Sequence, residues 1–190
     1  MIFDLNTFHI LSTDVEDTVY IWLEERSVTM VLDEENEALA AEVLERARQK
    51  GVTVGTAESC TGGLVAATLT AVPGSSDVVR GGVVSYWAEV KKGVLGVPED
   101  VIGTFGVVSE QCARAMAEGA ARVLGCDYAV STTGIAGPGG AEPGKPVGTV
   151  CFGLHAPQGE RTLTTCQGDS RAEVRSLAVR TALQLLLDEL

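Results

Sequence analysis

The chain has 190 residues, of which 26 are acidic and 14 are basic, for a formal net charge of −12. This length suits one domain with a sizeable core, and the 45% share of hydrophobic residues excludes a disordered chain. The acidity argues against nucleic acid as a partner, because phosphate neutralisation needs clustered Lys and Arg.

The cysteines exclude two further classes of protein. They number five, an odd count, and no two of them form a Cys-x-x-Cys pair, so neither a disulfide framework nor a metal site is predicted. The N-terminus lacks the pattern of a signal peptide, and no apolar run approaches the roughly 18 residues of a membrane span. We therefore expect a cytoplasmic protein with no membrane association.

Residues 1–33 stand apart from the rest of the chain. Two β-prone runs, 18–23 and 27–32, are joined by Glu24-Glu25-Arg26, which predicts a β-hairpin. We expect 1–33 to form an N-terminal appendage and 34–190 to form the main domain.

Within the main domain, helical and strand patterns alternate. An amphipathic helix is predicted over 34–50, because apolar residues recur at three- and four-residue steps until Gly51. Further helices are predicted over 64–72, 88–95, 98–104, 110–124 and from 170 to the C-terminus, and strands over 52–56, 81–86, 128–133, 148–154 and 161–166. The early alternation and the late hairpin indicate an α/β fold, a three-layer α/β/α sandwich with a mixed sheet.

The stretch Thr56-Ala57-Glu58-Ser59-Cys60-Thr61-Gly62-Gly63 joins the first of these strands to a helix. Backbone N–H groups at a helix start lack intrahelical partners, so this turn predicts a cradle for an anion or an oxyanion. The alternative is that Ser59 or Thr61 only caps the helix. Ligands in open α/β sheets lie at the carboxyl ends of strands, where Ser59, Tyr86 and the loop after Thr133 are all expected, which favours a site.

Two other motifs do not indicate nucleotide chemistry. The run 139–145 has the spacing of a phosphate-binding P-loop, but Pro146 stands where the magnesium ligand Ser or Thr is needed. Tyr86 and Lys91 are similar to the Tyr/Lys pair of short-chain dehydrogenases, but their spacing is one residue too long and no Gly-x-Gly-x-x-Gly follows the first strand. We expect no nicotinamide-dependent oxidoreductase.

A serine activated by an amine is the nucleophile that the sequence allows. The chain has only two histidines, so no Ser-His-Asp triad is convincing and Cys60 has no evident base. A lysine that is desolvated in a pocket can lose its proton and act as a base. Ser59 or Ser76, with Lys91 and Tyr86, meets this need.

At these residues the chain resembles the CinA C-terminal domain family, the nicotinamide mononucleotide deamidases. The resemblance runs in order from about residue 37 to 187 and leaves 1–33 outside. The motifs that carry it are Thr56 to Gly63, Pro73 to Ser76, Gly81 to Tyr86 with Lys91, Gly106 to Ser109, Ser131 to Pro138 and Lys145 to Val150.

The resemblance implies hydrolysis of the carboxamide of nicotinamide mononucleotide to nicotinate mononucleotide and ammonia, a step of pyridine nucleotide salvage and NAD metabolism. It implies an amidohydrolase that uses neither metal nor cofactor. By position, the active-site serine, the second serine, the tyrosine and the lysine of the family fall on Ser59, Ser76, Tyr86 and Lys91.

Further residues are expected to bind the substrate. In the turn these are Glu58, Thr61 and Gly62, and after the third strand they are Thr133 and the glycine-rich loop with Gly134 and Gly137. The family's Gly-Asp-Arg before the last helix is matched here by Gly168-Asp169-Ser170-Arg171, with one residue inserted, which places Arg171 at the phosphate or ribose.

In the resulting hypothesis, Ser59 attacks the carboxamide carbon, Lys91 takes its proton and Tyr86 relays or orients it. Ser76 stays open as the alternative nucleophile. A second class of function also stays open, namely a nucleotide- or partner-binding module without catalysis in a competence or damage response. A homodimer is compatible with an acidic domain that carries a β-arm.

Overall fold

A computed structural model describes residues 9–10, 21–22 and 33–190. The chain divides into two units, 1–31 and 32–190. In the first unit, β1 (His9–Ile10) pairs antiparallel with β2 (Ile21–Trp22). The predicted hairpin of runs 18–23 and 27–32 lies, apart from these two residues of β2, outside the described residues.

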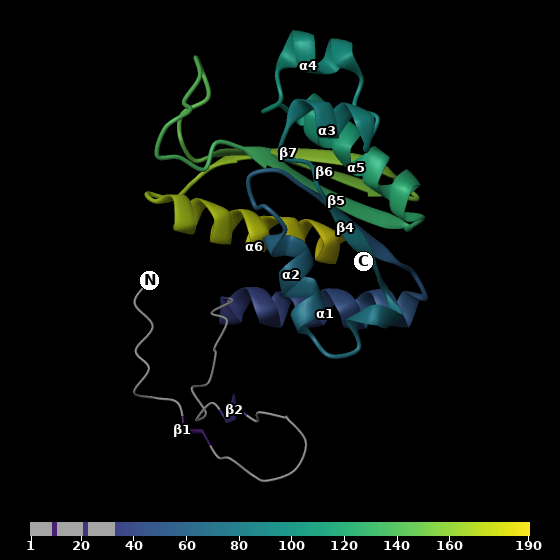
Figure 1. The fold of residues 1–190 in the computed structure, drawn as a ribbon. Helices are drawn as coiled ribbons and strands as arrows, with labels where there is room; N and C mark the ends of the chain where they lie inside the picture. The colour runs from purple at the N-terminus through teal and green to yellow at the C-terminus, as the bar shows by residue number, and fades with distance from the viewer. Residues whose placement is uncertain (1–8, 11–20, 23–32) are drawn as a thin grey trace. The chain divides into compact units, whose positions relative to one another are not determined.

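The second unit is built on one five-stranded sheet (Figure 1). Its strands have the spatial order β4-β3-β5-β6-β7, in which β4, β3 and β5 are parallel while β6 and β7 are antiparallel to their neighbours. The sheet is therefore mixed, as predicted. The strands are β3 (Val54–Glu58), β4 (Val79–Val84), β5 (Tyr128–Gly134), β6 (Thr149–Ala156) and β7 (Gly159–Cys166).

Helices cover both faces of this sheet, which confirms the three-layer α/β/α sandwich (Figure 1). One face carries α1 (Glu34–Lys50), α2 (Leu64–Ala71) and α6 (Arg171–Glu189), and the other carries α3 (Ala88–Gly93), α4 (Glu99–Phe105) and α5 (Glu110–Leu124). A short 3-10 helix, η2 (Ser75–Asp77), precedes β4. Among the helices of 33–190, none is both long and apolar enough to span a bilayer.

Strand alternation divides the core between the two faces. Successive side chains of a strand point to opposite sides, so Val54 and Val130 join the core under α1 and α6, whereas Ala57 and Ala129 join the core under α5. Phe152 is fully buried in the first of these cores. Full burial of a side chain of this size contributes about 1.5–3 kcal/mol, so these two apolar layers hold the adjoining sheet edge in place.

The three long helices begin at capping residues of the expected types, and two of them end at glycine. Asp33 caps α1 by accepting a hydrogen bond from the Glu35 amide, and the helix ends at Gly51 with φ 66°. Ser109 caps α5, which ends at Gly125, and Ser170 caps α6. The predicted starts and stops of these three long helices are therefore correct.

Two strands, β3 and β4, are each displaced as a whole by two residues from their predicted ranges. β3 begins at Val54 and continues to Glu58, because it pairs with β4 and β5 on both sides as far as Val84 and Thr132. β4 ends at Val84, so Tyr86 lies in the loop before α3 and not at the end of the strand.

Candidate active site

The carboxyl ends of the three parallel strands meet at one edge of the sheet, as the sequence predicts. Ser59 follows β3, Ser85 follows β4, and Gly134 ends β5. A pocket of about 370 Å³ opens at this edge, a size in the usual range for small-molecule sites. Its lining is formed by Ser59, Cys60, Tyr86, Ala88, Lys91, Val107, Val108, Thr133, Gly134, Ile135, Ala136, Gly137, Gly139, Gly140 and Arg171.

Lys91 and Ser59 are in direct contact in this pocket. Lys91 Nζ donates a 2.9 Å hydrogen bond to Ser59 Oγ and a second, short one to the backbone carbonyl of Ser85. The lysine comes from the last turn of α3, and only 1% of its surface is exposed. Within 33–190 it takes part in no ion pair.

The surroundings of Lys91 favour its neutral form. Burial lowers the pKa of the Lys91 amine, and the thiols of Cys112 and Cys60 act weakly in the opposite direction. Burial also raises the pKa of the Cys60 thiol to about 11, so this thiol stays protonated and acts as a packed group. An uncharged amine has a lone pair, and the 2.9 Å contact allows the Ser59 hydroxyl to donate its proton to it.

Glu58 lies behind this pair and not in the pocket. Its side chain is 1% exposed, and its carboxylate accepts hydrogen bonds from the amides of Gly63, Val65 and Ala66 at 2.8–3.0 Å. The anion cradle predicted at the start of α2 is therefore filled by a carboxylate of the chain itself. The prediction that Glu58 contacts the substrate is corrected on this ground.

Thr61 and Gly62 also hold the turn together, and neither of them lines the pocket. Thr61 is fully buried, with its hydroxyl 2.7 Å from both the Glu58 carboxylate and the Thr132 hydroxyl. Gly62 has φ 63°, a left-handed conformation that glycine adopts without strain. From the other side, Arg175 of α6 donates to the Thr61 carbonyl at 2.8 Å.

Tyr86 and Arg171 form one rim of the pocket. The Tyr86 ring is exposed, with 57% of the residue accessible, and its hydroxyl lies 3.4 Å from Arg171 Nη2. Arg171 also donates to the Gly137 carbonyl at 2.9 Å, so the inserted residue does not remove Arg171 from the pocket. Among the described residues Tyr86 forms no hydrogen bond to Ser59 or Lys91, so the structure does not support the predicted proton relay.

The glycine-rich loop after β5 forms another part of the pocket wall. Ile135 exchanges backbone hydrogen bonds with Thr149 and Gly148, which fixes the start of the loop on β6. The Thr133 hydroxyl donates to the Val107 carbonyl at 2.7 Å and so ties the segment before α5 to the pocket. Both Gly134 and Gly137 line the pocket.

Ser76 lies at the opposite edge of the sheet. It belongs to η2, which precedes β4, and the adjacent Val78 accepts a hydrogen bond from Val54 at the first residue of β3. Ser59 comes five residues after Val54, so about 16 Å of strand separates Ser59 from the start of β3, beside which η2 lies. Within one chain, Ser76 is therefore not available as the nucleophile or as its partner.

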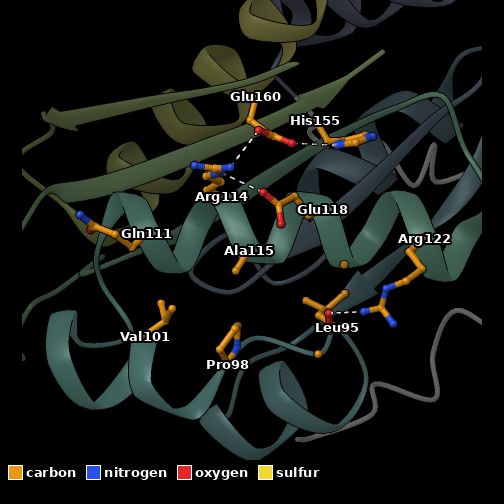
Figure 2. A pocket seen from close by; sticks show the side chains of 12 residues that line it. Leu95, Pro98, Val101, Gln111, Arg114, Ala115, Glu118, Arg122, His155 and Glu160 are labelled. Carbon is orange, nitrogen blue, oxygen red and sulfur yellow. Dashed lines mark hydrogen bonds and ion pairs between the residues drawn. The ribbon is translucent and has the colours of Figure 1, made fainter. Parts of the chain in front are cut away.

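A larger hollow, of about 780 Å³, lies on the outer side of α5 and contains none of the predicted residues (Figure 2). Three of its charged groups are paired with one another, since Arg114 bonds to Glu118 at 2.8 Å and to Glu160 at 3.0 Å, and Arg122 donates to the Leu95 carbonyl. His155 also lies beside Glu160. Within 33–190 no group of three or more His, Cys, Asp or Glu side chains is arranged to hold a metal ion.

One residue that holds Lys91 in place was missed from the sequence. Ser85 is buried, and its carbonyl accepts a hydrogen bond from Lys91 Nζ. Its place directly after a parallel strand, at the same edge as Ser59, is the signal that could have found it.

Several solved structures share the fold of this chain. Solved structures similar to this chain include the competence/damage inducible protein CihA from Agrobacterium tumefaciens, with a TM-score of 0.81 and 42% identity over 84% of this chain and 98% of that one. A CinA superfamily protein from Escherichia coli has a TM-score of 0.80 and 32% identity over 86% of this chain and 96% of that one.

Curated relatives include CinA-like proteins of Leptospira borgpetersenii and Myxococcus xanthus. The first is 48% identical over 75% of this chain and 34% of its own length, and the second is 47% identical over 85% and 39%. The chain thus spans little more than a third of these relatives. The family model of the CinA C-terminal domain matches residues 36–190, and the chain belongs to this family.

Proposed function

We propose that this chain hydrolyses the carboxamide of nicotinamide mononucleotide to nicotinate mononucleotide and ammonia without a metal ion. The contact between the buried Lys91 amine and Ser59 Oγ at 2.9 Å is the observation that carries the proposal. It supplies a nucleophile and a base in a pocket whose lining, within 33–190, contains no histidine.

In the proposed reaction, neutral Lys91 accepts the Ser59 proton while Oγ attacks the carboxamide carbon. The resulting lysine ammonium then gives this proton to the departing nitrogen, which leaves as ammonia, and an ester remains on Ser59. Lys91, neutral again, takes a proton from water as the water oxygen attacks the ester carbon. The lysine ammonium then returns this proton to Ser59 Oγ as the ester bond breaks, and the released acid ionises to the carboxylate product. The Ser85 carbonyl supports these steps by accepting a hydrogen bond from Nζ and keeping the nitrogen beside Ser59.

The oxyanion of the tetrahedral intermediate needs donors near Ser59. Cys60 comes directly after Ser59 and lines the pocket, and in the described part of the chain its amide N–H donates to no oxygen atom. We assign the oxyanion to this group, because a backbone donor fixed near a nucleophile stabilises developing negative charge without reorganisation.

The phosphate of the substrate is assigned to the rim. Arg171 has N–H groups beyond those that bond Gly137 and Tyr86, and the adjacent glycine-rich loop allows close approach of an anion. In a chain of net charge −12, this guanidinium provides the local positive charge that a phosphate requires.

Ammonia release from nicotinamide mononucleotide by the purified chain, measured with a chelator present, tests the proposal. We expect Lys91→Ala and Ser59→Ala each to lower kcat/KM by about 10²-fold or more, and wild-type activity to rise with pH through the lowered pKa of Lys91. Lys92→Ala is the matched control, because Lys92 is the next residue of α3 but pairs with Glu99 at the surface.

Two outcomes would contradict the proposal. Wild-type rates in both Ser59→Ala and Lys91→Ala would remove these residues from the chemistry. Binding of the nucleotide by the wild-type chain without ammonia release would indicate a binding module in place of an enzyme.

A further inference from the structure

We propose that Glu58 is a positioning residue. Through the hydrogen bonds of its buried carboxylate and its backbone carbonyl, it keeps the Ser59 nucleophile within hydrogen-bonding distance of the Lys91 base. This inference rests on the proposed role of Ser59 and Lys91. It concerns how the pair is assembled, whichever amide is the substrate.

The Glu58 carboxylate joins the end of β3 to the start of α2. Its donors come from both sides of Ser59 in the sequence, and each of its two oxygens is used. Oε1 accepts from the Thr56 hydroxyl at 3.2 Å and the Ala66 amide at 2.8 Å, and Oε2 accepts from the Thr61 hydroxyl at 2.7 Å and the amides of Gly63 and Val65 at 2.9 and 3.0 Å.

A carboxylate is the group that fits this place. The N-cap of α2 is Gly63, which has no side chain to accept a hydrogen bond from the first turn, so the helix amides would otherwise be unpaired and buried. Their partial positive charge and the two hydroxyls compensate the buried negative charge. A glutamine has one acceptor oxygen, and its NH₂ group would face at least one N–H donor without an acceptor.

The same residue is linked to both members of the catalytic pair. Ser59 is next in the chain, and since the side chains of neighbouring strand residues point to opposite faces, fixing Glu58 toward α2 directs Ser59 toward α3. The Glu58 carbonyl accepts a 2.7 Å hydrogen bond from the Ser85 amide, and the Ser85 carbonyl accepts one from Lys91 Nζ. A shift of Glu58 therefore changes the Oγ to Nζ distance.

A serine-directed fluorophosphonate tests this, because it measures the reactivity of Ser59 without the nucleotide substrate. The rate of Ser59 labelling, identified by mass spectrometry, is compared in wild type, Glu58→Gln and Asp127→Asn, each corrected for the folded fraction from urea denaturation. Asp127 is the matched control, since its carboxylate accepts two hydrogen bonds from Thr53 near the opposite end of β3.

We expect Glu58→Gln to label at least about tenfold more slowly per folded molecule, and Asp127→Asn to label at the wild-type rate. Where the amidase activity is measured in parallel, kcat falls in Glu58→Gln while KM stays within about threefold. A merely structural role would lower the folded fraction of Glu58→Gln and leave the corrected labelling rate unchanged.

Thr61 variants keep the test decisive if Glu58→Gln does not fold. Thr61→Val removes one donor to the carboxylate and should slow labelling by about fivefold, and Thr61→Ser should restore it. Unchanged labelling in the folded Glu58 variant, or in Thr61→Val where that variant does not fold, would overturn the inference. So would the absence of Ser59 labelling in wild type. Labelling of wild-type Ser59 without ammonia release from nicotinamide mononucleotide would refute the proposed substrate only.

Discussion

Replacing Lys91 with methionine should change how the stability of the fold depends on pH. Burial lowers the pKa of Lys91 in the folded state from the ordinary value of 10.5, so between these two pKa values the unfolded chain binds one more proton than the folded chain. Stability then rises with pH, by at most about 1.4 kcal/mol per pH unit, from the lowered pKa up to about 10.5. Methionine has a similar shape and no proton to bind, so Lys91→Met loses this contribution.

The difference in stability between the wild type and Lys91→Met depends on the hydrogen bonds of Lys91 Nζ. Above pH 10.5 the amine is neutral in both states, and the wild type keeps two hydrogen bonds, to Ser59 and Ser85, that methionine cannot form. At about 1 kcal/mol for each bond, the wild type should be more stable there by about 2 kcal/mol. As the pH falls toward the lowered pKa, this advantage should shrink and then reverse.

Urea denaturation followed by circular dichroism, at each pH from 7 to 10, measures this difference, because every other titrating group cancels between the two proteins. Lys92→Met is the control and should follow the wild-type slope, since Lys92 lies partly in solvent. Parallel stability curves for wild type and Lys91→Met would refute the reasoning. They would mean that Lys91 binds its proton equally well in the folded and unfolded states and is no general base.

Three further substitutions test the placement of other residues. Tyr86→Phe removes the hydroxyl that meets Arg171, and we expect KM to rise a few-fold with kcat nearly unchanged in steady-state assays, whereas a large fall in kcat would restore the proton relay. Ser76→Ala should leave the ammonia-release rate unchanged, and a loss of activity in the folded variant would contradict a site built at one sheet edge. Gly119→Ala should destabilise the fold by about 1–3 kcal/mol in thermal melts, although alanine favours helices, because its Cβ would collide with the Leu95 carbonyl oxygen; a higher melting temperature would show that this contact relaxes.

The helices and the common edge of the pocket could be predicted because local chemistry determines them. Glycines at 51 and 125 end two amphipathic patterns, and parallel strands bring their carboxyl ends together whatever their spacing in the chain. The meeting of Lys91 with Ser59 is a consequence of this rule. The distance between them could not be predicted, because it depends on the packing of α3 against the sheet.

Two predictions failed for reasons of strand geometry. The sequence pattern ended β3 at Thr56, and this hid the alternation that turns Glu58 away from Ser59. The Ser76 motif was grouped with the site by sequence alone, although a residue that precedes a parallel strand lies at the amino edge of the sheet. For Glu58 the strand boundary, which is the least certain part of a sequence-based assignment, decided the outcome.

The lack of an anionic neighbour for Lys91 within 33–190 bears on how the proposed reaction would end. Hydrolysis turns an uncharged amide into a carboxylate directly beside this amine, and that carboxylate is the counter-ion that the described part of the chain does not provide. An opposite charge at this distance raises the proton affinity of an amine. Product inhibition that strengthens in mildly acidic solution is the expected signature, and turnover there would be limited by departure of the product and no longer by bond cleavage.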